Sequence, residues 1–156
     1  MERKTVDATA SRISEPPEGW AMQPQGTSTA ELYRLLQETY FDAIDGGDAD
    51  TAVTALYEDV EWVHTQVWEH DGHTSDETDT MDGRAEVRAF LAARIEEMQV
   101  EGIEHKVREA LAYDDQGSFR AEVVGPDGET EPFLGSVELT DGLISTYVVG
   151  PAGLPG

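Results

Sequence analysis

The sequence predicts an α+β domain in which one curved, mixed but mostly antiparallel sheet folds over three helices near the N-terminus. Between positions 28 and 100, apolar residues recur at spacings of three and four, the period of amphipathic helices. Beyond position 100 apolar and polar residues alternate, and turn sequences separate the alternating segments. A sheet that curls without closing leaves a pocket between its concave face and the helices.

The chain is predicted to divide near position 28. Residues 1–28 carry Pro16, Pro17 and Gly19 with little apolar periodicity, a composition typical of a flexible arm. One domain is expected over residues 29–151, followed by a short tail at 152–156. A chain of 156 residues is long enough for one sizeable core and too short for two.

The first predicted helix begins at Ser28, which forms a capping box with Glu31. Apolar residues follow at helical spacing over residues 32–44, and the glycine pair at 46–47 ends the helix. Because Tyr40 lies within this apolar stripe, its ring is expected to face the interior of the domain.

A second, shorter helix is predicted after Asp48, with an apolar side that extends through Leu56 and Tyr57. A strand then follows over residues 60–64, in which Val60, Trp62 and His64 share one face. The histidine is therefore expected at a strand end, beside the pocket.

Residues 66–82 are polar and rich in turn formers, which predicts a long loop that can act as a lid. A third helix is expected next, with Val87, Phe90, Leu91, Arg94, Ile95 and Met98 along one side. Four strands are then predicted near 103–113, 118–125, 130–140 and 143–150.

Composition excludes several classes of partner. The chain has 33 acidic and 10 basic residues and a formal net charge of −23, a field that repels nucleic acids and anionic membranes. We therefore expect neither as a partner. The chain has no cysteine, which excludes disulfides and thiolate metal sites. Without a long apolar run or a signal peptide, the sequence is that expected of a soluble, cytoplasmic protein.

Four sequence segments carry a resemblance to a known family. They are Tyr40 to Asp48 (YFDAIDGGD), Leu56 to Trp62 (LYEDVEW), Gly83-Arg84 with Val87 and Phe90-Leu91, and Glu138 to Ile144 (ELTDGLI) with Tyr147. From about Leu32 to Val149 the chain resembles the nuclear transport factor two-like superfamily, in its SnoaL-like (polyketide cyclase-like) and ketosteroid isomerase-like branch.

The resemblance implies a cone-shaped domain that encloses an apolar pocket and pairs as a homodimer through the outer face of its sheet. Strand residues expected to supply apolar surface for that pairing are Phe119, Val123, Phe133 and Val137. Members of the superfamily include isomerases, cyclases, epoxide hydrolases, dehydratases and binding domains, so the resemblance implies a fold and a range of functions.

The ketosteroid isomerase pattern suggests roles for three residues. Tyr40 falls on the position of the tyrosine that donates a hydrogen bond to the oxyanion. His64 falls on the position of the carboxylate base, and Ser136 on that of a second, aspartic acid donor. An imidazole can remove a proton next to a carbonyl, and a serine is a weaker donor than a carboxylic acid. The pocket wall is expected to include Tyr57, Trp62, Trp68, Phe90 and Leu134.

Other interpretations of these residues remain open. Arg120-Ala121-Glu122 resembles the Arg-x-Asp pair of limonene epoxide hydrolases, and Glu122 or Glu138 can serve as the carboxylate base of a polyketide cyclase. Arg120 and Glu122 equally fit an ion pair in solvent or at a dimer contact. Tyr40 equally fits a core ring, and His64 an ordinary polar residue.

The loop also holds a cluster of possible metal ligands: His70 and His73 with Asp71 and Asp76, following His64. Their spacing is not one that aims two imidazoles at a point on a regular element, so we expect a solvated loop with no metal and no cofactor. As part of a lid, these histidines would make ligand affinity sensitive to pH between about 5 and 7.

The leading functional hypothesis is a cofactor-free acid/base enzyme of the isomerase, cyclase or hydrolase type. Its substrate would be a small hydrophobic carbonyl or polyketide-like compound, with Tyr40 as the oxyanion donor and His64 as the group that moves the proton. The alternatives are a non-catalytic protein that binds a small hydrophobic molecule, an epoxide hydrolase-like enzyme whose water-activating pair is His64 and Glu122, and an assembly domain.

Overall fold

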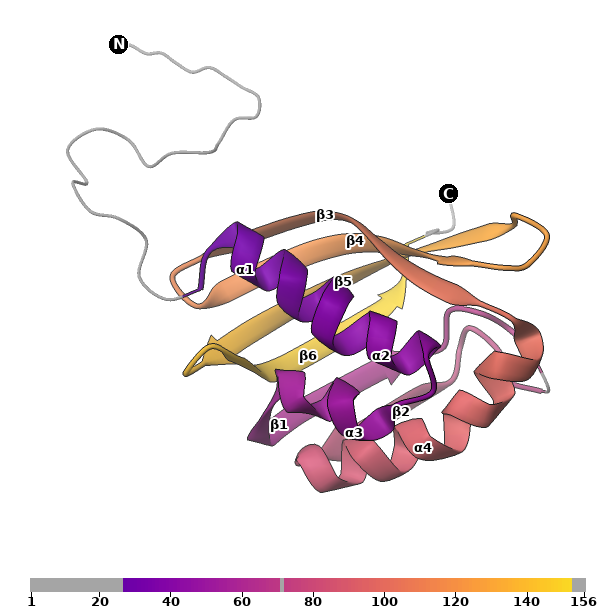
Figure 1. Cartoon of the computed structure of the whole chain (residues 1–156), viewed down its shortest axis with the longest axis horizontal. Helices are drawn as coiled ribbons and strands as arrows, with labels where there is room; N and C mark the ends of the chain where they lie inside the picture. Colours follow the sequence, from indigo (N-terminus) through magenta and orange to yellow (C-terminus); the bar gives the residue numbers. More distant parts are fainter. Residues whose placement is uncertain (1–26, 71, 153–156) are drawn as a thin grey trace, which may run out of the picture.

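The computed structural model describes residues 27–70 and 72–152 and shows helices packed against one face of a curved, open sheet (Figure 1). This is the α+β architecture that the sequence predicts. The predicted arm and tail lie outside the described residues except at their inner ends, so both stay predictions.

The N-terminal helical segment consists of α1 (Thr29–Arg34), η1 (Leu35–Phe41) and α2 (Asp42–Asp45). The predicted capping box is present: the Glu31 amide donates to the Ser28 hydroxyl over 3.1 Å, and the Ser28 amide donates to the Glu31 carboxylate over 2.8 Å. The middle part, η1, winds as a wider π-helix, a feature that sequence periodicity does not predict. It carries Tyr40 and Phe41 into the core.

The second helical segment is shorter than predicted. It comprises α3 (Ala49–Ala52) and the 3-10 turn η2 (Val53–Ala55), with the Thr51 amide capped by the Asp48 carboxylate over 3.0 Å. Leu56 and Tyr57, predicted as helical, instead begin strand β1 (Leu56–Thr65). The reason is tertiary, because Leu56 pairs with Ile144 in the neighbouring strand.

The sheet has six strands in the order β2-β1-β6-β5-β4-β3. Besides β1, its strands are β2 (Thr78–Asp82), β3 (Glu104–Tyr113), β4 (Gln116–Val124), β5 (Thr130–Thr140) and β6 (Leu143–Pro151). The contact between β1 and β6 is parallel and the other contacts are antiparallel, which confirms the mixed, mostly antiparallel sheet.

Strand β2 corrects the prediction of a loop over residues 66–82. Its sequence, TDTMD, has little apolar content because it forms an edge that pairs only with β1. In this pairing His64 lies directly opposite Asp79. Edge pairing thus places a carboxylate beside the predicted base.

The third predicted helix is confirmed as α4 (Arg84–Glu101). Val87, Leu91 and Ile95 are buried along its inner side, and Gly102 ends it in the left-handed conformation with φ 72°. This helix contacts both β1 and β2, so it covers the part of the sheet that flanks the predicted loop. No helix among the described residues is long and apolar enough to cross a membrane.

The strand residues expected to supply the dimer surface lie in the core instead. Phe119, Val123, Phe133 and Val137 are each at most 4% exposed. Successive side chains of a strand point to opposite faces of the sheet, so the outer face carries the residues that lie between these four. An assignment of faces that is wrong by one position exchanges the inner and the outer set of residues. The homodimer itself remains a prediction.

Candidate functional site

A cavity of about 70 Å³ lies between the concave face of the sheet and the helices. Most of its wall is apolar or aromatic, and its polar groups come from η1, β1, the segment after β1, α4, β3 and β6. The lining residues are Tyr40, Phe41, Ile44, Trp62, His64, Gln66, Val67, Trp68, His70, Phe90, Leu91, Arg94, Met98, Ile103, His105, Val123, Phe133, Tyr147 and Val149.

Tyr40 is held by contacts on several sides. Its hydroxyl accepts a hydrogen bond from the Trp62 indole N–H over 3.0 Å, and its ring lies 5.4 Å from that of Tyr147. One turn earlier, Gln37 links η1 to β3, because its side-chain amide oxygen accepts a hydrogen bond of 2.7 Å from the Val107 N–H. Tyr40 therefore has little freedom to turn away from the cavity.

Burial raises the pKa of Tyr40 well above its ordinary value, although hydrogen bonds with Trp62 and Tyr147 act in the opposite sense. The phenol consequently stays protonated at physiological pH. Since the indole N–H occupies one lone pair of the oxygen, the hydroxyl proton remains for donation to a third group. Tyr40 has the chemistry of a neutral hydrogen-bond donor to a developing negative charge.

His64 lies on the same face of β1 as Trp62, and the two rings stack at a centroid distance of 5.4 Å with 6° between their planes. Burial, with smaller effects of Arg94 and His105, lowers the pKa of His64 to about 4, while Glu77 acts in the opposite sense. The imidazole is therefore neutral near pH 7. Its buried Nδ1 has no hydrogen-bond partner within residues 27–70 and 72–152.

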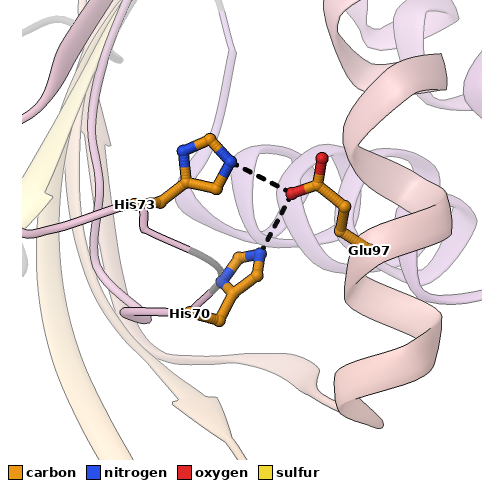
Figure 2. Close-up of side chains that lie close together, drawn as sticks. All are labelled: His70, His73 and Glu97. Atoms are coloured by element: carbon orange, nitrogen blue, oxygen red, sulfur yellow. Dashed lines mark hydrogen bonds and ion pairs between the residues drawn. The ribbon is translucent and has the colours of Figure 1, made fainter.

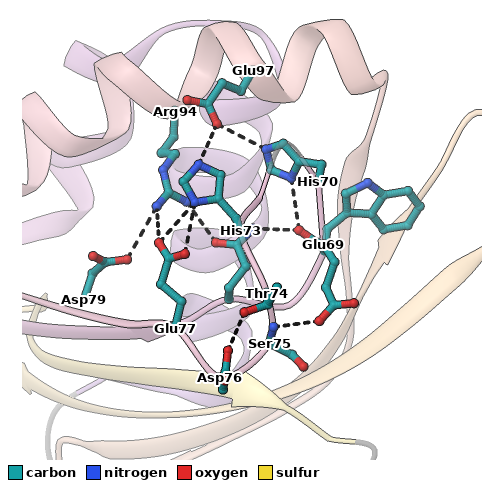
Figure 3. A network of polar contacts seen from close by, with 12 residues as sticks. Glu69, His70, His73, Thr74, Ser75, Asp76, Glu77, Asp79, Arg94 and Glu97 are labelled. Atoms are coloured by element: carbon teal, nitrogen blue, oxygen red, sulfur yellow. Dashed lines mark hydrogen bonds and ion pairs between the residues drawn. The ribbon is translucent and has the colours of Figure 1, made fainter.

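Asp79, which lies opposite His64 in the β1–β2 pairing, forms an unpredicted polar group with Arg94. Figure 3 shows Asp79 and Arg94 facing each other. The Asp79 Oδ2 atom is buried and makes no hydrogen bond within the described part of the chain, and an Arg94 nitrogen lies 3.6 Å from it. Arg94 also donates to Gln66 over 2.8 Å and to Glu77 over 2.9 Å. An arginine within the apolar side of a predicted helix was the signal available for this group.

Five of the predicted site residues line the cavity: Tyr40, Trp62, His64, Trp68 and Phe90. Five others do not. Tyr57 is half-buried on β1 outside the cavity wall, while Leu134 and Ser136 are exposed because Phe133 and Val137 take the inward positions of β5. Ser136 therefore cannot act as the second donor in this arrangement.

Arg120 and Glu122 also lie outside the cavity. They form ion pairs along the outer side of the sheet, Arg120 with Glu109 at 3.6 Å and Glu122 with Arg108 at 2.9 Å. The residue between them, Ala121, takes the inward position and is buried. The pair is thus separated from Tyr40 and His64 by the sheet itself, as is the exposed Glu138.

The prediction of a solvated loop is wrong for His70, because its side chain is only 4% exposed and lines the cavity. His70 and His73 pair through their backbones as an isolated β-bridge. The segment between β1 and β2 is therefore folded against α4 at these positions. Of the acidic residues predicted as possible ligands with these histidines, Asp71 lies outside the described residues. The Asp76 carboxylate accepts a hydrogen bond from the Thr74 hydroxyl.

Solved structures share this fold at low sequence identity. A provisionally assigned ketosteroid isomerase from Kribbella flavida is 20% identical with a TM-score of 0.57, and 82% of each chain is covered. A provisionally assigned polyketide cyclase from Sinorhizobium meliloti is 18% identical with a TM-score of 0.54, covering 79% of this chain and 99% of that one. An LEH-like epoxide hydrolase of M. tuberculosis is 22% identical with a TM-score of 0.53, covering 79% and 84%.

The family comparison covers most of the domain. No curated protein matches the sequence significantly. The model of the SnoaL-like domain matches residues 38–147, which include the end of η1, helix α4, strands β1 to β5 and the first part of β6. This match confirms the resemblance found in the sequence. The chain belongs to the SnoaL-like family.

Proposed function

We propose that this protein is a cofactor-free acid/base enzyme that moves a proton next to the carbonyl of a small, mostly apolar compound. The observation that supports it best is that Tyr40 and His64 line one apolar cavity. One is a neutral hydroxyl donor and the other a neutral imidazole with an unpartnered nitrogen. Enolisation needs these two functions on either side of one carbonyl group.

In the proposed reaction, Nδ1 of His64 takes a proton from the carbon next to the carbonyl. The electron pair of the broken C–H bond forms the C=C bond of the enolate, and the carbonyl oxygen gains negative charge. Tyr40 donates a hydrogen bond to that oxygen, in a site where few other dipoles compete. In D₂O the imidazolium proton is replaced by a deuteron from solvent, and transfer of that deuteron from His64 to the carbon restores the C=O bond and completes the exchange.

Asp79 supports this assignment of His64. The two residues are directly opposite in the β1–β2 pairing, where Cβ atoms are about 4.5–5.5 Å apart. The imidazolium formed during the reaction would be stabilised by the Asp79 carboxylate. Asp79 is in this account a positioning residue, and Arg94 holds its carboxylate.

The cavity limits the size of the substrate. Its volume of about 70 Å³ is well below the ~300–1,000 Å³ typical of pockets for drug-sized ligands. The best fit is therefore a ketone of few heavy atoms. A polyketide-like compound would require the segment after β1 to move away from α4.

The test is catalysis of deuterium exchange into cyclopentanone, a small ketone with acidic C–H bonds, followed by NMR in D₂O. Wild type is expected to exchange the ketone faster than buffer does. Tyr40→Phe and His64→Ala are each expected to lower the rate about tenfold or more, since each removes one of the two functions. Tyr33→Phe is the matched control, because Tyr33 is an exposed tyrosine of the same helical segment.

Equal exchange rates for wild type, Tyr40→Phe and Tyr33→Phe would contradict the proposal. Far-UV circular dichroism should show that each variant is folded before its rate is compared. Loss of exchange in Tyr33→Phe as well would point to a general effect on the fold rather than to the hydroxyl of Tyr40.

One observation favours a second candidate, a non-catalytic protein that binds a small hydrophobic molecule. A base with a pKa of about 4 is weak at pH 7, and a ligand-binding cavity does not need one. This alternative predicts saturable binding of cyclopentanone with no acceleration of exchange in any variant.

A further inference from the structure

His70, His73 and Glu97 converge on one point (Figure 2), and His70 also lines the cavity. Nε2 of each histidine lies 3.2 Å from the same oxygen, Oε1 of Glu97. The three ligand atoms all lie within 4.8 Å of one another. The histidines come from the segment after β1 and the glutamate from α4, so tertiary folding assembles the group.

The backbone and the other ring nitrogens hold both imidazoles in place (Figure 3). His70 and His73 exchange backbone hydrogen bonds of 3.2 and 2.7 Å. Nδ1 of His70 lies 3.0 Å from the Trp68 carbonyl oxygen, and Nδ1 of His73 lies 3.1 Å from both oxygens of Glu77. Carbonyl and carboxylate oxygens only accept, so each Nδ1 is the donor.

This arrangement leaves a conflict at Nε2. A neutral imidazole has one N–H, and when Nδ1 carries it, Nε2 presents a lone pair. Both lone pairs then face Oε1 of Glu97, which is itself an acceptor. Such a cluster needs positive charge at its centre, supplied either by a second proton on each ring or by one cation shared by all three groups.

The contacts at both nitrogens of each ring favour the shared cation, because Nδ1 donates and both Nε2 atoms lie 3.2 Å from the same oxygen of Glu97. A divalent ion would satisfy both rings and the carboxylate at once. Histidines that bind metals usually donate the other N–H to a carbonyl or a carboxylate, as His70 and His73 do here.

We propose that His70, His73 and Glu97 bind a divalent first-row transition metal ion, of which Zn²⁺ is the representative. Imidazole nitrogen disfavours Ca²⁺ and Mg²⁺, which prefer oxygen ligands. Bonds of about 2.0–2.1 Å in a tetrahedron place neighbouring ligand atoms about 3.3–3.4 Å apart, close to the 3.2 Å between each Nε2 and Oε1.

Three protein ligands leave at least one coordination position for water or for an oxygen of a bound molecule. Because His70 also lines the cavity, the ion would border the proposed ligand site. The metal site does not depend on the acid/base function of Tyr40 and His64. Measurement of ion binding therefore tests the metal site independently of the proposed acid/base function.

The test is metal titration of the full chain without an affinity tag, after removal of bound metal with a chelator. Co²⁺ binding is followed by visible absorption and Zn²⁺ binding by calorimetry. We expect one ion per chain, with a dissociation constant of about 10 μM or tighter, a range within reach of three ligands.

Glu97→Gln is expected to weaken binding at least tenfold, since it removes the anionic ligand. The matched control is Glu96→Gln, which makes the same change of charge on an exposed neighbour in α4 and should bind as wild type does. His73→Gln provides an independent ligand variant if Glu97→Gln does not fold. Absence of saturable one-to-one binding, or equal affinities of the folded ligand variants and Glu96→Gln, would overturn the proposal in favour of protonated histidines.

Discussion

Replacement of Trp62 by alanine is expected to lower the free energy of unfolding by about 3–5 kcal/mol, the range typical of deleting a buried tryptophan. Trp62 is 1% exposed, stacks on both His64 and Tyr147 with 6° between ring planes, and meets Phe90 edge-on. Its N–H also satisfies the Tyr40 hydroxyl. Alanine would remove the packing and leave that hydroxyl without its donor.

Urea denaturation measures this effect. Trp68→Ala is the matched control, because Trp68 lines the same cavity but is only partly buried, so its loss should cost less. Trp62→Phe should recover most of the stability, since it restores a ring but not the N–H donor. A cost for Trp62→Ala no larger than that for Trp68→Ala would show that the aromatic stack is not central to the core.

Protonation of His64 is expected to destabilise the protein by about 3 kcal/mol between pH 6.5 and pH 4. The pKa of His64 is about 4 in the folded state, against an ordinary value of 6.5. In this window the unfolded chain binds the proton first, so acid favours unfolding, and each unit of pKa difference contributes about 1.4 kcal/mol. The stability is fully present above pH 6.5 and is lost as the pH falls towards 4.

Many carboxylates also titrate in acid, so the measurement is a difference. The free energies of unfolding of wild type and His64→Gln are compared at pH 7 and at pH 4.5. The groups that act on His64 are Arg94, His105 and Glu77, with Asp79 opposite it, and all are kept in the variant. The advantage of wild type over the variant should shrink by roughly 2 kcal/mol on acidification. A pH-independent difference would mean that His64 is not desolvated.

The sequence predicts the fold well because local signals coincide with the final structure. The capping box at Ser28, the glycine pair at 46–47 and the alternation of strands β3 to β6 all act within a few residues. Strand β2 was not predicted, because an edge strand needs only one partner and shows no apolar pattern. The early end of the second helix depends on pairing with β6, which is distant in sequence.

The candidate site was predicted only where one element decides which way a side chain points. Tyr40 belongs to a helical stripe, and His64 shares the face of the strongly buried Trp62. Ser136 was assigned to the wrong face of β5, where the choice between two alternating sets of residues depends on the whole sheet. Asp79 and the partner Glu97 of the two histidines were missed, because each meets its neighbours through a different element.

The central claim is that Tyr40 donates a hydrogen bond to a carbonyl bound in the cavity. The most direct test is the ¹³C NMR shift of carbonyl-labelled cyclopentanone with saturating protein, since a hydrogen bond polarises the carbonyl and moves its resonance downfield. We predict a downfield shift with wild type and with Tyr33→Phe, and its loss with Tyr40→Phe that still binds the ketone. A bound ketone whose carbonyl shift is the same in wild type and in Tyr40→Phe would contradict the account.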